Sequence, residues 1–154
     1  MRFLYNIGVQ FYGFVVRFVA LFGNEKAKGW INGRKDIFKQ LKEVEPNAIW
    51  IHAASLGEFE QGRPIIEAIK TKTPQQKILL TFFSPSGYEV RKNYPLADYI
   101  FYLPLDNRQN ANQFVALTKP KLAIFIRCEF WYYYINELHL NQIPIYSVSA
   151  IFRT

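Results

Sequence analysis

Cysteine and histidine are scarce in this 154-residue chain. It has one cysteine, Cys128, and two histidines, His52 and His139. A single cysteine excludes a disulfide framework, and the Cys and His spacing of zinc sites is missing. The chain also has neither a G-x-G-x-x-G nor a G-x-x-x-x-G-K segment, which disfavours a dinucleotide site or a P-loop. We therefore expect neither a metal nor a cofactor.

Low-complexity linkers and internal repeats are absent as well. Half of the residues are hydrophobic and 18% are aromatic, so the chain is too apolar for disorder and long enough for one domain with a core. Acidic residues are rare only at the start. Residues 1–42 carry eight basic and two acidic residues, whereas residues 43–154 carry eleven and ten. Most of the net charge of +7 therefore belongs to an N-terminal arm.

That arm opens with an apolar run over residues 3–22, which has the length of a bilayer span. Asn6, Gln10 and Arg17 interrupt the run, and a charge inside hydrocarbon is costly. The basic residues that follow it are Lys26, Lys28, Arg34 and Lys35. Basic residues in this place hold the next domain on the cytoplasmic side and against anionic lipid.

We therefore expect residues 1–46 to form a membrane-anchor helix and a basic amphipathic segment, lying in or dipping through the inner leaflet. The alternative is the first core helix of a soluble domain. Nucleic acid is a poor explanation of the charge, because the basic residues flank an apolar helix and form no groove.

Residues 47–154 alternate between strand and helix signals. The expected strands are 48–52, 77–82, 99–103, 122–126 and 144–149, and the expected helices are 58–71, 85–93, 107–118 and 129–141. Strands such as KILLTFF and KLAIFI are continuously apolar, which is typical of a parallel sheet covered on both faces. The pattern predicts an α/β domain, an open parallel Rossmann-like sheet with right-handed connections.

Ligands of such sheets bind at the carboxyl ends of the strands. Two of the turns expected there consist of small residues at the start of a helix, and their N–H groups suit an anion. These candidate binding residues are Ser55 and Gly57 in the first turn, and Ser84, Ser86 and Gly87 in the second.

Two acids, Glu58 and Glu129, begin the helices after the first and fourth strands. They could converge on one cleft as a general base and its neighbour, or only complement helix dipoles. We expect His52 to be buried and hydrogen-bonded, and His139 to lie on a helix surface. The aromatic block at residues 131–134 suits core or interface packing.

Five stretches resemble the N-terminal half of the bacterial 3-deoxy-D-manno-octulosonic acid (Kdo) transferase family, in its order and spacing. They are HAASLGE, TFFSPSGYE, YLPLDNRQNANQF, KPKLAIFIRCEFW and IPIYSVSAIFR. The resemblance implies the glycosyltransferase-B architecture, in which two Rossmann-like domains enclose a cleft. It also implies transfer of Kdo from CMP-Kdo to a lipid A precursor at the cytoplasmic face of the inner membrane.

The resemblance makes Glu58 the catalytic base of an inverting transfer, and it places the family's second acid at Glu129. It implies an acceptor-binding domain over residues 47–154. Arg127 stands where many members have an acid, and Tyr132 where many have proline. Members are more than twice this length, so we expect a fragment that lacks the CMP-sugar domain and is inactive alone.

Two alternatives stay open at this point. One is a related membrane-bound transferase that uses another nucleotide sugar. The other is a non-catalytic, membrane-tethered α/β binding module.

Overall fold

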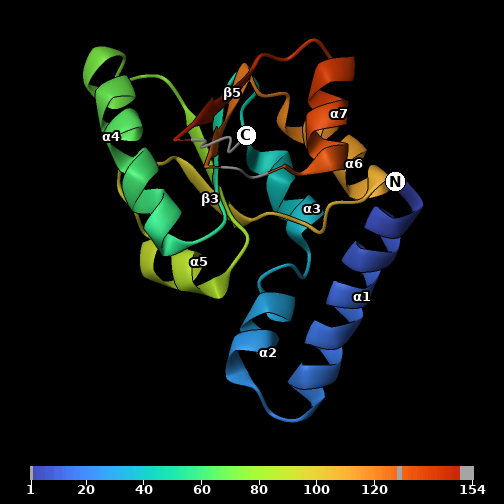
Figure 1. Cartoon of the computed structure of the whole chain (residues 1–154). Helices are drawn as coiled ribbons and strands as arrows, with labels where there is room; N and C mark the ends of the chain where they lie inside the picture. The colour runs from blue at the N-terminus through green and yellow to red at the C-terminus, as the bar shows by residue number, and fades with distance from the viewer. Residues whose placement is uncertain (1, 128–129, 150–154) are drawn as a thin grey trace.

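The computed structural model describes residues 2–127 and 130–149, and a five-stranded parallel sheet forms their centre (Figure 1). The strands are β1 (Ile49–Ala53), β2 (Ile78–Phe82), β3 (Tyr99–Tyr102), β4 (Leu122–Ile126) and β5 (Ile145–Val148). Their order is β3-β2-β1-β4-β5. From the central β1 the chain adds β2 and β3 on one side. It then crosses back and adds β4 and β5 on the other side. The carboxyl ends of β1 and β4 flank the point where this direction reverses, which is where open α/β sheets bind ligands.

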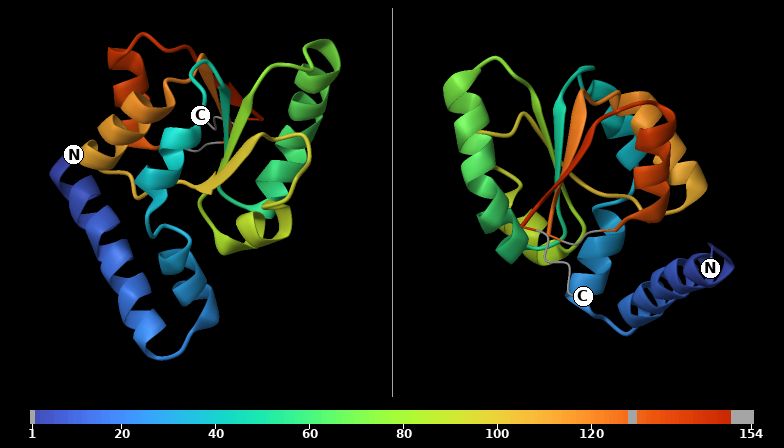
Figure 2. Two further views of the ribbon diagram at one scale, coloured as in Figure 1. Left: turned by 180° about the vertical axis from the view of Figure 1, so that it is seen from behind. Right: turned by 45° about the horizontal axis from the view of Figure 1, so that its top comes forward.

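Helices cover both faces of the sheet, as Figures 1 and 2 show. One face carries α4 (Leu56–Lys72) and α5 (Pro85–Arg91), and the other carries α3 (Ile37–Gln40), α6 (Arg108–Thr118) and α7 (Tyr132–Leu140). Alternate residues of β1 enter the two cores: Ile51 packs with Phe59 of α4, and Trp50 packs with Phe114 of α6. Because both faces are covered, the strands are apolar throughout, and the predicted α/β class is confirmed.

The boundaries differ from the predicted ones at the helix starts. Helix α4 begins at Leu56, two residues before the expected start, and α7 begins at Tyr132 instead of 129. The segment before Pro46 forms only the short α3 and a 3₁₀ turn, Leu41–Glu43. Ile37 and Leu41 nevertheless lie in the core beneath α6.

The N-terminal arm is a helical hairpin that projects from the sheet domain (Figure 2). Its first helix, α1 (Arg2–Leu21), is long and apolar enough to cross a membrane, by length and composition only. Only Gly13 of α1 is buried. The second helix, α2 (Glu25–Asn32), starts at Asn24, whose side chain accepts a hydrogen bond from Ala27 N–H.

Arg34 joins this hairpin to the domain, and the prediction that it faces lipid is wrong. Its guanidinium is largely buried and donates hydrogen bonds to the carbonyl oxygens of Leu103 (2.9 Å), Phe83 (2.8 Å) and Trp30 (3.1 Å). It also lies over the Trp30 ring, 3.8 Å from the ring centre. Burial lowers the pKa of Arg34 to about 9. Three carbonyl acceptors and an aromatic face replace the water that this side chain loses.

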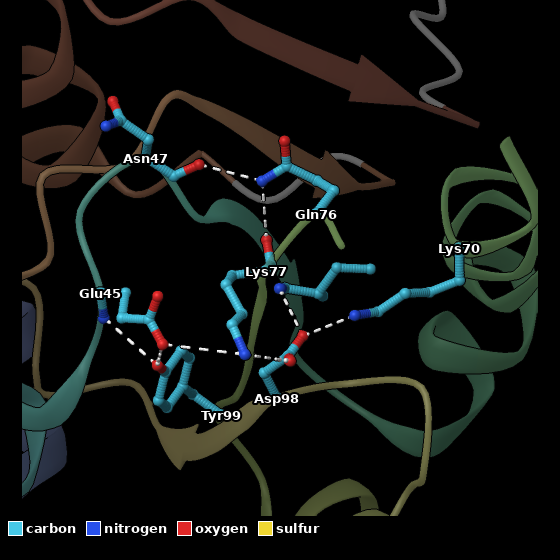
Figure 3. A network of polar contacts seen from close by, with 8 residues as sticks. Glu45, Asn47, Lys70, Gln76, Lys77, Asp98 and Tyr99 are labelled. Atoms are coloured by element: carbon cyan, nitrogen blue, oxygen red, sulfur yellow. Dashed lines mark hydrogen bonds and ion pairs between the residues drawn. The ribbon is translucent and has the colours of Figure 1, made fainter. Parts of the chain in front are cut away.

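Charged side chains gather at the amino ends of the strands (Figure 3). Asp98 accepts hydrogen bonds from Lys70 (2.7 Å), Lys77 (3.2 Å) and the Ile78 N–H (2.9 Å). Burial raises the pKa of Asp98, but these hydrogen bonds outweigh it and hold the pKa below its ordinary value. The network fixes the connection between β2 and β3 at the edge opposite the carboxyl ends of the strands.

Candidate functional site

Glu58 holds together the turn between β1 and α4. Its Oε2 accepts hydrogen bonds from the N–H groups of Ala54 (2.7 Å) and Ser55 (3.1 Å). In return, the Ser55 hydroxyl oxygen accepts the Glu58 N–H at 3.5 Å. This reciprocal pair is a capping box, with Ser55 at the N-cap and Glu58 at the third helical position. The carboxylate therefore has a structural role that the dipole argument underestimated.

The other oxygen of Glu58 is not used by the fold. Among the described residues, Oε1 accepts no hydrogen bond, and the side chain is half-buried. The capping box thus fixes one oxygen and orients the second. A carboxylate oriented at a strand end is the geometry that a general base requires.

The second small-residue turn lies beside the first. The N–H of Ser84 donates to the carbonyl oxygen of Ala54 (2.8 Å), and the hydroxyls of Ser84 and Ser86 are 2.5 Å apart. The prediction that the two turns share one edge of the sheet is confirmed. Their binding of an anionic acceptor group remains a prediction.

The two glycines of these turns differ. A side-chain carbon at Gly87 would lie 2.4 Å from Cδ1 of Phe82 and 3.2 Å from the backbone nitrogen of Leu56. A side-chain carbon at Gly57 would meet nothing within 4 Å, and Gly57 is exposed. Packing alone requires glycine at position 87. At position 57 the fold leaves open space beside Glu58.

Glu129 lies outside the described residues, so its predicted place at the edge stays a prediction. The residues on either side of it reach the other turns. The Trp131 ring lies 4.7 Å from the Phe83 ring and 5.7 Å from the His52 ring, measured between centres. Arg127 has a left-handed backbone (φ 64°) and donates its N–H to Val148 O at 2.7 Å.

His52 is fully buried, as predicted, but its Nε2 has no hydrogen-bond partner among the described residues, so only Nδ1 is satisfied. Its Nδ1 lies 2.9 Å from the Thr81 hydroxyl oxygen, which also accepts the Trp50 indole N–H at 2.8 Å. Burial lowers the pKa of His52 to about 3. The imidazole is therefore neutral at ordinary pH. His139 is exposed on α7, which confirms the second histidine prediction.

The sequence did not predict the structural roles of two polar side chains, Arg34 and Asp106. Asp106 follows β3 and is fully buried. A lone basic residue and a lone aspartate carry no periodic signal, and their partners are distant in sequence. Within residues 2–127 and 130–149, no group of His, Cys, Asp and Glu side chains converges as a metal site.

A comparison with known protein families matches most of this chain. Residues 29–154 match a family described as 3-deoxy-D-manno-octulosonic-acid transferase (kdotransferase). The chain belongs to the Kdo transferase family. The matched region includes all five strands and both small-residue turns. The resemblance to the Kdo transferase family that the five sequence stretches indicated is thus confirmed.

Two of three similar proteins carry the corresponding name. A 3-deoxy-D-manno-octulosonic acid transferase of Haemophilus influenzae is 34% identical over 68% of this chain and 25% of its own length. Its namesake in Aquifex aeolicus is 41% identical over 54% of this chain and 23% of its own. A bifunctional glycosyltransferase/methyltransferase of Fusobacterium nucleatum is 32% identical over 84% of this chain and 20% of its own length. The chain spans about a quarter of the length of these relatives.

Proposed function

We propose that this chain forms the acceptor-binding half of a glycosyltransferase that moves Kdo from CMP-Kdo to a lipid A precursor. The position of Glu58 is the observation that supports this most. Its carboxylate stands at the reversal point of the sheet, oriented by a capping box, with open space at Gly57.

The proposed reaction is a single displacement. The acceptor hydroxyl gives its proton to Oε1 of Glu58 as its oxygen bonds to the anomeric carbon of Kdo. The bond from that carbon to the phosphate of CMP breaks, CMP leaves with the electron pair, and the configuration inverts. Inverting glycosidases activate water with a carboxylate in the same way. In this proposal Glu129 is the second acid.

The acceptor subsite in this proposal consists of the two joined turns. Ser55, Ser84 and Ser86 offer hydroxyl groups, and the open side of Gly57 admits a sugar ring. Gly87 offers only its backbone, because Phe82 fills the space of a side chain. Donor binding falls to the part of the relatives that this chain does not span.

We further propose that residues 1–46 seat the protein on the cytoplasmic side of the inner membrane and that residues 47–154 form the acceptor domain. The outward side of α1 carries an exposed apolar face, made of Phe3, Leu4, Ile7, Phe11, Phe14, Val15, Phe18, Leu21 and Phe22. Its other side carries Asn6, which contacts the domain. A one-sided helix of this kind lies in the interface plane more readily than it spans.

The test of the base uses a chimera in which residues 29–154 replace the corresponding part of the Haemophilus influenzae relative. Glu58→Gln keeps the shape and the capping acceptor, and we expect turnover of CMP-Kdo with a lipid A precursor to fall about 10²- to 10⁴-fold. Glu67→Gln, on the exposed side of the same helix, is the control and should keep full turnover. Near-normal turnover of Glu58→Gln would overturn the assignment.

One relative favours a second candidate. The Fusobacterium nucleatum bifunctional glycosyltransferase/methyltransferase matches more of this chain than the two Kdo transferases described above. A transferase of the same architecture with another nucleotide sugar is therefore the second proposal. A panel of nucleotide sugars offered to the full-length parent enzyme separates the two: turnover of CMP-Kdo alone supports the first, and turnover of another nucleotide sugar supports the second.

A further inference from the structure

A buried carboxylate caps α7 from outside the helix. Asp106 is fully buried, and its oxygens accept hydrogen bonds from the N–H groups of Tyr133 and Tyr134, all at 3.1 Å. These N–H groups open the helix and have no partner within it. Trp131, at the N-cap position, supplies no side-chain cap. Asp106 therefore does the work of an N-cap from the loop after β3.

The same carboxylate also binds the N-terminal arm. The hydroxyl of Tyr5 in α1 donates to Oδ2 of Asp106. One residue further on, Oδ1 of Asn6 accepts the hydroxyl of Tyr133 at 2.6 Å. Two neighbouring residues of α1 thus bind the domain across more than 100 residues of sequence: Tyr5 binds Asp106, and Asn6 binds Tyr133 in the first turn of α7.

No cation shares the charge of Asp106 among the described residues. Burial raises the pKa of Asp106, against the opposing effect of the three groups that donate hydrogen bonds to it. Hydrogen bonds to a buried ionised group are among the strong ones. Loss of the Tyr5 hydroxyl removes one of the three donor groups and leaves the carboxylate to the two N–H groups of α7.

Ring contacts hold α1 against the domain: Tyr5 lies beside the rings of Tyr132 and Tyr133, and Tyr12 lies beside Phe83. Only Gly13 of α1 is buried, where a side-chain carbon would lie 2.9 Å from Leu105. The apolar face points away from the domain. The hydrogen bonds of Tyr5 and Asn6 add directional polar contacts to this packing.

We infer that Tyr5 and Asp106 are positioning residues that connect the seating of α1 on a lipid surface to the order of the first turn of α7. This inference rests on the proposed membrane role of the arm. Helix α7 starts three residues after Glu129 in the sequence. A lipid-bound α1 that holds Asp106 in place would thereby set the start of the helix that follows the proposed second acid.

The test measures hydrogen exchange at the amides of Tyr133 and Tyr134 in the purified chain. The chain is studied alone and with vesicles of phosphatidylcholine and phosphatidylglycerol, and co-sedimentation reports vesicle binding. Tyr5→Phe removes the hydroxyl. Tyr12→Phe is the matched control, since the Tyr12 hydroxyl in the same helix makes no hydrogen bond to any described residue. Amides of β1 serve as the internal reference for global unfolding.

We expect vesicles to slow exchange at the two amides in the unmodified chain and in Tyr12→Phe. In Tyr5→Phe, exchange should be roughly tenfold faster and insensitive to vesicles, while vesicle binding and the β1 amides stay unchanged. Asp106→Asn, which keeps the size but not the charge, should also speed exchange at these amides.

Four results would overturn the inference. Tyr5→Phe could bind vesicles and exchange like the unmodified chain, or both tyrosine variants could exchange equally fast. The unmodified chain could also bind vesicles with no change at these amides, which would end the coupling and leave the proposed membrane role intact. A chain that binds no vesicles would end the membrane role and the coupling together.

Discussion

The backbone N–H of Ser84 donates a hydrogen bond to the carbonyl oxygen of Ala54 at 2.8 Å. This bond joins the turn after β1 to the turn after β2. Since the capping box holds Ala54 N–H on Glu58, the carboxylate, the first turn and the second turn form one hydrogen-bonded unit. Movement of one turn is therefore transmitted to the other, and stability measurements should report on both.

The capping role of Glu58 predicts a difference between two substitutions. Glu58→Ala removes the acceptor of two N–H groups and should lower the free energy of unfolding by about 0.5–2 kcal/mol. Glu58→Gln retains an acceptor oxygen at this position and should cost clearly less. Urea unfolding of the two variants measures this. Equal losses would mean that the box contributes nothing beyond charge.

The two glycines of the edge should respond in opposite ways to alanine. Gly87→Ala places a methyl 2.4 Å from Phe82 Cδ1 and should destabilise the fold by about 1–3 kcal/mol. Gly57→Ala meets open space in a helix and should be neutral or stabilising by up to about 1 kcal/mol. Thermal unfolding of both variants checks this. A bulky residue at position 57 is consequently the better probe of acceptor binding, since loss of binding there cannot be ascribed to misfolding.

Removal of Arg34 should detach the hairpin from the domain. Arg34→Leu leaves the carbonyl oxygens of Leu103 and Phe83 without this donor, and should cost at least about 1.5–3 kcal/mol. The fluorescence of Trp30, which is buried against the guanidinium, should shift to the red. Lys35→Leu at the exposed neighbouring position is the control. A blue, unshifted spectrum in Arg34→Leu would contradict this docking role.

His52 should make stability depend on pH. Its pKa is lowered from 6.5 to about 3 by burial, so the unfolded state binds one more proton between these values. Stability is therefore greatest above pH 6.5 and falls as the pH falls, by up to roughly 1.4 kcal/mol per pH unit. His52→Gln removes the imidazole that binds this proton in the unfolded state. Urea unfolding at pH 7 and pH 5 should show the unmodified chain losing about 2 kcal/mol more than the variant. Parallel losses in both proteins would count against it.

Membrane seating predicts the fractionation of the expressed chain. The exposed apolar face of α1 should keep the chain with membranes through washes in high salt and carbonate. Replacement of Phe11 and Phe14 by serine should release it, because both side chains belong to the apolar face and are more than half exposed. Recovery of the unmodified chain in the soluble fraction without detergent would refute the anchor.

The sequence was informative where partners are close along the chain. Continuous apolar strands predicted the parallel sheet. The predicted helix over 58–71 was right in kind but began two residues late, because the capping box of Ser55 and Glu58 starts α4 at Leu56. Burial of Arg34 could not be predicted this way. It depends on the carbonyl oxygens of Phe83 and Leu103, which reach it only after the sheet has formed. The role of Gly87 was likewise hidden, since it depends on the Phe82 ring and the backbone of Leu56.

The strand order has a consequence for synthesis of the chain. The central strand β1 pairs with β2 on one side and with β4 on the other. About 70 residues separate the end of β1 from the start of β4, which a ribosome needs about 4–14 s to add at about 5–20 residues per second. Throughout that interval one edge of β1 has no neighbour, and such an edge accepts foreign strands. A nascent chain paused before residue 122 would therefore be the form most exposed to aggregation, and the form most in need of a chaperone.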